Sequence, residues 1–360
     1  MTYKNSFEPK WTTPPGATVL DLLHERKLPV YRLAQEIHTD LSSLSRLIYG
    51  VEPLTQDWAE KLSQALGASP TFWLRREELY RDDLKRLYRQ VAEKESKRWL
   101  QNLPLKDMID FGWIKQGSSI FETSLNVCAF FGVTTAEAFD NQYQGLLSNS
   151  AFHTSNAFVS QSSAIATWLR QGEIEALSID CASWNDEKLH SSLDEIRELS
   201  KEKDPAIFLP KLKLLLANCG IAMVIARTPS GCRASGATRF FNSEKALMQF
   251  SFRYLVDDQF WFTVFHEIGH LLLHAHEELF LEELEGRISE AETEANEFAF
   301  NTLFAKVEAD ELDHVKLSRF DIARFARKAG VAPGIVVGQL QRRGRIPYNH
   351  FNYLKILYTW

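Results

Sequence analysis

Long uncharged apolar runs are absent from this sequence of 360 residues. No stretch could span a membrane, and the N-terminal segment "MTYKNSFEPKWTTPPG" lacks the apolar run of a signal peptide. Cysteine is scarce as well, and the four cysteines stand far apart with no paired spacing, as is typical of reduced thiols in a cytosolic protein. We therefore expect a soluble, cytoplasmic protein with no membrane partner.

An excess of positive charge is also absent. The formal net charge is −6, so the overall charge favours neither nucleic acid nor an anionic membrane, and any contact with DNA has to come from a local patch. Hydrophobic residues make up 45% and charged residues 24% of the chain, as in ordinary globular proteins. The length suits two or three domains.

The chain does contain a clear change of pattern near residue 215. Helical patterns dominate before it, whereas short β-type runs follow at 221–227, 236–241 and 246–252. The expected fold class is therefore mainly α with a small β-sheet, that is, an α+β core preceded by an all-α N-terminal domain. The expected parts are 1–90, a connector over 91–210, the core over 211–310 and a helical part over 311–360.

The segment "FWFTVFHEIGHLLLH", Phe260 to His274, combines an apolar helix with metal-binding side chains. His266 and His270 are four residues apart, so both imidazoles lie on one face of a helix and can reach one ion. Glu267 can approach the open side of that ion. This His-Glu-x-x-His spacing is the zinc-helix signature, in which the glutamate is the general base. Asp257 and Asp258 are the expected N-caps of the helix.

A catalytic zinc needs a third protein ligand. His274 lies about 12 Å along the helix axis from His266, too far for one ion. His276 matches the outer spacing of the metzincin motif, but Leu273 stands where that motif needs glycine for its turn. Glu292, in the acidic helix "ETEANEFAFNTLF", is the preferred ligand.

Apolar residues at helical spacing give this acidic helix one face that can pack on the zinc helix. Asn296 shares a face with Glu292 and is expected to hydrogen-bond a ligand histidine, whereas Glu294 is expected to face elsewhere. The alternative is that these histidines are buried and only satisfy a neighbouring backbone or carboxylate group.

The stretches "FWFTVFHEIGHLLLH", "ETEANEFA" and "GVAPGIVVGQLQRRGRIP" together resemble the ImmA/IrrE family of metallopeptidases, over about residues 215 to 350. The resemblance implies a gluzincin-like Zn²⁺ site with ligands His266, His270 and Glu292 and the base Glu267. It also implies a protein substrate such as a helix-turn-helix repressor. The repeated spacing of Ala326, Gly330 and Val336 resembles the helix-turn-helix-like subdomain that follows the core in this family, and a packing role is favoured for it.

A helix-turn-helix pattern occupies the N-terminal part. Ala34 is small enough for two helices to cross, His38 falls at the turn, where positive φ is favoured, Asp40 is the expected N-cap of the second helix, and Leu44 fills the core. The stretch from "RLAQEIHTDLSSLSRLIYG" onward resembles HigA-type antitoxins and the wider XRE repressor class. The residues expected to contact DNA are Leu41, Ser42, Ser43, Ser45 and Arg46.

Charge argues against strong DNA binding, because residues 1–90 carry 13 Lys and Arg against 12 Asp and Glu, a net of +1. A helix-turn-helix can also serve as a protein-binding or dimerisation module, which leaves a homodimer open. Two functions follow. One is a DNA-binding regulator fused to a zinc peptidase that cleaves a repressor, an antitoxin or itself. The other is an antitoxin or regulator with a toxin partner, in which the peptidase fold only binds or senses.

Overall fold

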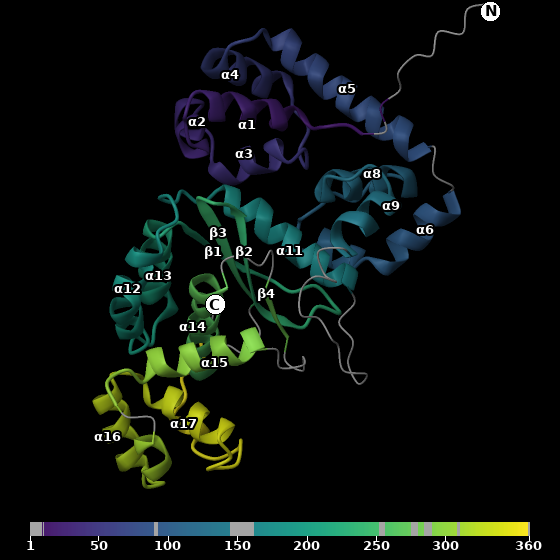
Figure 1. Cartoon of the computed structure of the whole chain (residues 1–360). Coiled ribbons are helices and arrows are strands. Elements are labelled where there is room, and N and C mark those ends of the chain that lie inside the picture. The colour runs from purple at the N-terminus through teal and green to yellow at the C-terminus, as the bar shows by residue number, and fades with distance from the viewer. Residues whose placement is uncertain are drawn as a thin grey trace, which may run out of the picture. The chain divides into compact units, whose positions relative to one another are not determined.

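The computed structural model describes residue 9 and residues 11–89, 93–144, 162–251, 256–274, 280–283, 290–307 and 310–358. The chain is mainly helical with one small sheet, as the sequence predicts (Figure 1). Within the described residues, no helix is both long and apolar enough to cross a membrane.

The chain divides into two compact units. The first contains residues 1–148, 160–180 and 229–232, and the second contains 149–159, 181–228 and 233–360. The expected connector over 91–210 is therefore shared between the two units.

In its described residues, the first unit contains helices and no strands. Its apolar core includes Leu33, Leu44 and Trp73, all with at most 2% of their surface exposed. Its helices are α1 (Pro15–Glu25), α2 (Val30–Glu36), α3 (Leu41–Ile48), α4 (Gln56–Leu66), α5 (Pro70–Arg89), α6 (Glu93–Asn102), α7 (Leu105–Asp110), α8 (Ile120–Phe131), α9 (Ala136–Phe139), the π-helical turn η1 (Asp140–Gln144) and α11 (Ser162–Leu177).

Helices α2 and α3 lie on either side of the turn that the sequence predicts at His38. His38 has φ 50°, as expected for a residue in the turn, and the side chain of Asp40 caps α3 by accepting a hydrogen bond from the backbone N–H of Ser43 at 2.8 Å. Ala34 and Leu44 are buried between the helices. The local expectations at these four residues are confirmed.

The second unit contains a four-stranded sheet in the order β1-β3-β2-β4. Strand β3 runs parallel to β1 and antiparallel to β2, and β2 also pairs with β4. The strands are β1 (Ile221–Ala226), β2 (Ala234–Asn242), β3 (Lys245–Ser251) and β4 (Phe280–Glu283). The first three confirm the predicted β-type runs, whereas β4 was not predicted because it is short and lies in the acidic sequence "EELFLEELEG".

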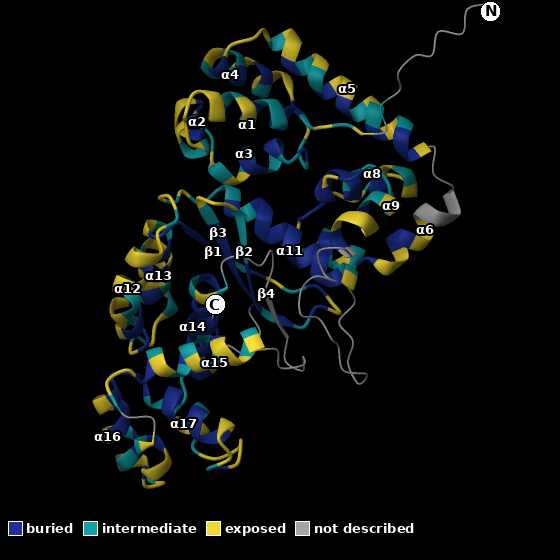
Figure 2. Ribbon diagram, viewed as in Figure 1, coloured by how far each residue is buried: buried dark blue, intermediate teal, exposed yellow. Residues whose placement is uncertain are grey.

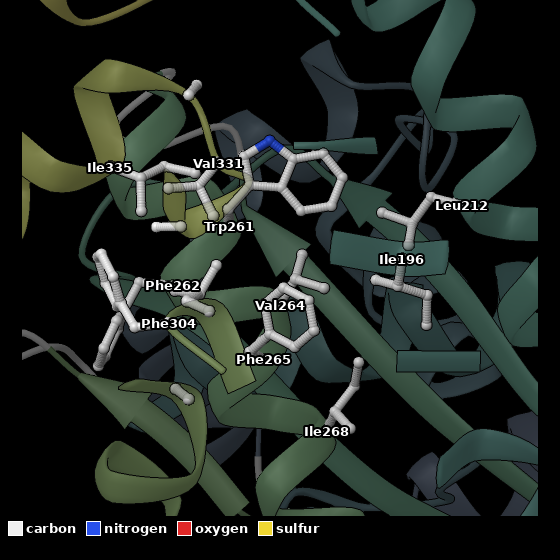
Figure 3. Packing of buried hydrophobic residues seen from close by; sticks show 14 of the residues in the cluster. Ile196, Leu212, Trp261, Phe262, Val264, Phe265, Ile268, Phe304, Val331 and Ile335 are labelled. Carbon is white, nitrogen blue, oxygen red and sulfur yellow. The ribbon is translucent and has the colours of Figure 1, made fainter. Parts of the chain in front are cut away.

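Helices pack around this sheet, with α13 beside β1 and α14 beside β2. They are α12 (Asp186–Leu199), α13 (Pro205–Asn218), α14 (Asp257–Leu273), α15 (Glu290–Leu303), α16 (Arg319–Ala329) and α17 (Pro333–Arg342), with the 3-10 turns η2 (Glu311–His314) and η3 (Asn352–Leu354). Trp261 and Phe265 of α14 lie in the core of this unit with Ile196, Leu212 and Ile335 (Figure 3).

The predicted N-caps of α14 are wrong. Val256 occupies the cap position, and Asp257 and Asp258 form the first turn of the helix. Asp257 Oδ1 accepts hydrogen bonds from the backbone N–H of Asp258 and of Ile356, both at 3.0 Å, and Asp258 Oδ2 binds Lys355 Nζ at 2.6 Å. The two carboxylates therefore hold the C-terminal segment against α14, a role that needs a residue about a hundred positions away.

Helices α16 and α17 follow one another near the C-terminus. Gly330 has φ 78° in the turn between α16 and α17, and Ala326 and Val336 are buried. Helix α17 packs against α14, in agreement with the packing role favoured from the sequence.

Candidate metal centre

The two motif histidines lie on a deeply buried helix. Every residue of α14 from Trp261 to Leu271 is buried, and His266 and His270 each have 1% of their surface exposed (Figure 2). Apolar residues all around a helix are expected when it lies inside a core rather than at its edge. The surrounding protein therefore fixes the direction in which both imidazoles point.

Helix α15 brings the third candidate ligand. Ala295, Ala299 and Leu303 are fully buried and line the side of α15 that packs on α14. Glu292 Oε2 lies 3.3 Å from His266 Nε2, and Glu292 Oε1 lies 3.3 Å from His270 Nε2. The predicted packing face of α15 thus delivers the carboxylate to both histidines.

His266, His270 and Glu292 form a group that could hold a metal ion. The two histidine Nε2 atoms are 3.0 Å apart, and one ligand atom from each of the three residues lies within 4.8 Å of the others. The side chain of Glu292 is 22% exposed, whereas both histidines are almost completely buried. The group is therefore open to solvent on the side of Glu292.

The protonation states of the group suit a cation. Burial lowers the pKa of His270, which favours the neutral imidazole that binds metals. For Glu292, burial by itself would raise the pKa, but hydrogen bonds from His266 and His270 outweigh it, so the pKa of this carboxyl lies well below its usual range. The carboxylate is charged at neutral pH.

A second histidine and a second glutamate support the group from outside. His274 Nδ1 lies 3.3 Å from His270 Nδ1, and His274 Nε2 lies 2.8 Å from Glu294 Oε2. If His270 Nδ1 carries its proton, it donates to His274, and His274 donates to Glu294, so that His270 Nε2 presents a lone pair toward His266 and Glu292. Glu294 lies outside the metal group, as expected, and its carboxylate instead contacts His274, the C-cap residue of α14. The signal that could have found His274 is its spacing of four residues from His270.

Asn296 does not have its predicted role. Its side-chain oxygen accepts a hydrogen bond from Arg342 Nη2 at 2.9 Å, and within the described residues it bonds neither ligand histidine. The Arg342 guanidinium also lies 4.4 Å from the centre of the Phe262 ring, one helical turn before His266. Asn296 therefore ties α15 to α17, an interaction that needs the C-terminal helices in place.

Glu267 lies on the sheet side of the metal group. It is fully buried, and the Thr238 hydroxyl of β2 donates a hydrogen bond to its Oε2. The carboxylate also lies against β2 at Gly236, where a Cβ atom would come within 2.2 Å of Glu267 Oε1. The predicted base thus stands next to the ligand His266 and is held by a strand. His276, the alternative ligand, lies outside the described residues.

The residues predicted to contact DNA have different environments on α3. Ser42 is exposed, and Leu41 and Ser43 are half-buried. Ser45 is 1% exposed, so the expectation that it points outward is wrong. Arg46 Nε donates to Glu52 Oε1 at 2.9 Å, so this cation is already paired.

Helix α11 packs against α3 within the first unit, as do α1 and α2. Tyr49, one turn after Ser45 on the same face of α3, has its ring centre 4.4 Å from the Arg170 guanidinium of α11. Helix α11 therefore packs against the C-terminal end of α3, where Tyr49 is the cap residue.

Comparison of the chain with protein families and with curated proteins gives no matching family model and no matching curated protein. The geometry of the metal group is therefore the principal observation bearing on function.

Proposed function

We propose that this protein is a zinc-dependent peptidase. The observation that carries the proposal is the group of His266, His270 and Glu292, with Glu267 next to His266 in α14. Catalytic zinc is typically held by three protein ligands, and a His-His-Glu set is one of the known combinations. The proposal agrees with the resemblance of these residues to the ImmA/IrrE family.

The distances within the group support zinc. Zinc bonds to imidazole nitrogen and carboxylate oxygen are about 2.0–2.2 Å long, so ligand atoms around a tetrahedral ion lie about 3.4 Å apart. The observed separations are 3.0 Å between the two histidine nitrogens and 3.3 Å from each to Glu292. The three residues can take up such an ion with small movements of their side chains.

The residues of this chain divide the work of peptide hydrolysis. Bound zinc supplies Lewis-acid chemistry, which makes a water molecule more acidic and polarises the peptide carbonyl. Glu267 accepts the proton of the attacking water as its oxygen bonds to the carbonyl carbon, and it delivers that proton to the leaving nitrogen as the carbon–nitrogen bond breaks. The partly exposed side at Glu292 leaves access for a substrate.

The resemblance favours a helix-turn-helix repressor or an antitoxin as the substrate, or the protein itself. The test is to load the purified protein with Zn²⁺, incubate it alone and with helix-turn-helix repressors encoded beside its gene, and identify new termini by mass spectrometry. The wild type should cut one of them, and Glu267→Gln should bind zinc equally well and cut none. Cleavage by Glu267→Gln, or a purified wild type that binds no zinc, would refute the proposal.

DNA binding by the first unit is a second candidate function. The positive φ of His38 and the Asp40 cap support a helix-turn-helix, but of the predicted contact residues Ser45 is buried, and Arg46, although partly exposed, is already paired with Glu52. A gel shift on the protein's own promoter, combined with zinc analysis, separates the functions. Promoter binding by a protein that binds no zinc would favour a regulator or antitoxin with a toxin partner, in which the peptidase fold only senses.

A further inference from the structure

Strand β2 presents two residues to the helix that carries the metal group. In the antiparallel ladder Gly236 lies opposite Phe250 and Thr238 lies opposite Met248, and residues opposite each other project to the same face of a sheet. Phe250 and Met248 belong to the core that contains α14. Gly236 and Thr238 therefore lie on the face of the sheet that packs against α14.

Both residues contact the carboxylate of Glu267. The Thr238 hydroxyl donates a hydrogen bond to Glu267 Oε2. Glu267 Oε1 fits against Gly236 only because glycine has no side chain: a Cβ atom there would be 2.2 Å from this oxygen. Thr238 and Glu267 are both completely buried. A hydrogen bond between a hydroxyl and a carboxylate in a buried site is stronger than in water and fixes the orientation of both groups.

We propose that Thr238 is a positioning residue for the proposed base Glu267, and that Gly236 is required so that the carboxylate can lie flat against β2. This inference rests on the proposed peptidase function. A glutamate side chain has three rotatable bonds, so a base on a helix reaches its proton reliably only if a neighbour selects one rotamer. Loss of the hydroxyl leaves the carboxylate free to turn, and a displacement of about 1 Å in a catalytic group can cost on the order of 100-fold in rate.

A probe that needs no knowledge of the substrate tests the idea. Acetohydroxamate chelates zinc through two oxygens, and a carboxylate beside the ion can accept a hydrogen bond from it. We expect Thr238→Val to weaken acetohydroxamate binding to the Zn²⁺-loaded protein about 10-fold by calorimetry, the size of one lost charge-assisted interaction. Zinc affinity, which depends on His266, His270 and Glu292, should change less than about 3-fold, within the scatter of additive sites.

Two further variants distinguish positioning from a general effect on packing. Thr238→Ser keeps the hydroxyl and should restore most of the affinity. Thr263→Val makes the same exchange on α14, one turn before Glu267. Within the described part of the chain the Thr263 hydroxyl makes no hydrogen bond to Glu267. The acetohydroxamate affinity of this variant should therefore equal that of the wild type. Gly236→Ala should weaken acetohydroxamate binding at least as much as Thr238→Val, because the added methyl displaces the carboxylate.

A double-mutant cycle decides the outcome. If Thr238 acts through Glu267, Thr238→Val has no further effect on acetohydroxamate affinity in the Glu267→Gln background. An equal loss in both backgrounds, or no loss in the wild-type background, overturns the role of Thr238 and leaves the zinc proposal standing. A wild type that binds neither zinc nor acetohydroxamate would refute the proposed function itself.

Discussion

His274 is the residue that most directly supports the metal group from outside. Its contact with His270 Nδ1 and with Glu294 selects the tautomer of His270 that offers Nε2 to a cation. We expect His274→Ala to lower zinc affinity about 10- to 100-fold, the usual effect of removing such a partner. Competition with a fluorescent zinc chelator measures this.

Glu294→Gln gives a matched control for His274. The amide can still accept a hydrogen bond from His274 Nε2 but is uncharged, so zinc affinity should fall less than in His274→Ala. Equal zinc affinity in the wild type and His274→Ala would mean that the other contacts of α14 already fix His270.

Asp257 gives a prediction for the dependence of stability on pH. Burial raises the pKa of Asp257 to about 7, and the neighbouring Asp258 carboxylate raises it further. The backbone N–H groups of Ile356 and Asp258, and the charge of Lys355, act in the opposite direction and lower this pKa. The ordinary value is 3.8, so the folded state holds this proton more tightly than the unfolded state. The protonated Asp257 carboxyl therefore contributes to the free energy of unfolding. This contribution is fully present below pH 4 and is lost as the pH rises through about 7.

Asp257→Asn removes the charge but keeps an oxygen for the two backbone donors. We expect the variant to be more stable than the wild type at pH 8.5, with a smaller difference at pH 5, in urea unfolding at both values. Asp258→Asn is the control, because it breaks the ion pair with Lys355 and should destabilise the protein at pH 8.5. The same difference between Asp257→Asn and wild type at both pH values would contradict the raised pKa.

Local spacing predicted the metal group well, and the residue-scale errors have one cause. His266, His270 and Glu292 follow from helical periodicity and the packing of two neighbouring helices. Ser45 and Asn296 were misjudged because other helices determine their environments: several helices pack on α3, and Asn296 binds Arg342 of the distant α17. A helical wheel gives the face of a residue but not which distant element covers that face.

At the scale of elements, one buried arginine links α11 to two other helices. Arg170 donates to Glu173 Oε2 at 2.7 Å and to the backbone oxygen of Phe130 in α8 at 2.7 Å, and its guanidinium also lies beside Tyr49 of α3. This one side chain connects three helices. We expect Arg170→Met to destabilise the first unit by about 3–5 kcal/mol in urea unfolding, because it leaves the Glu173 carboxylate buried without its charge partner.

The same unit contains an exposed pair with the same spacing. Arg75 and Glu78 also stand three residues apart, but their side chains are 60% and 57% exposed, against 9% and 8% for Arg170 and Glu173. Arg75→Met should leave the urea midpoint nearly unchanged, since exposed pairs contribute little. If both substitutions have the same small effect, α11 is not held against α3 and α8 by Arg170.

Element types were easier to predict than element partners. The helices around Glu292 and near the C-terminus, and three of the four strands, have clear periodicity or β-branched and aromatic runs. Strand β4 depends on its pairing with β2, since Phe280 and Leu281 alone do not define a strand. The packing of α11 on α3 likewise depends on residues more than a hundred positions apart.

At the scale of the whole molecule, the two units have separate apolar cores, and the metal group belongs to the second alone. A ligand that binds only the folded state stabilises it, by about 2.7 kcal/mol at a free concentration 100 times its Kd. Zinc should therefore stabilise the second unit and leave the first unchanged.

Metal removal tests this separation. We expect calorimetry of the Zn²⁺-loaded protein to give two unfolding transitions and EDTA to lower the midpoint of only one. Limited proteolysis at a temperature between the two midpoints, with the fragments identified by mass spectrometry, assigns that transition to residues of the second unit. His266→Ala should have the lowered midpoint without EDTA and should not respond to it. If EDTA lowers both midpoints together, the two units unfold as one cooperative body; if it lowers neither, the group of His266, His270 and Glu292 does not bind zinc.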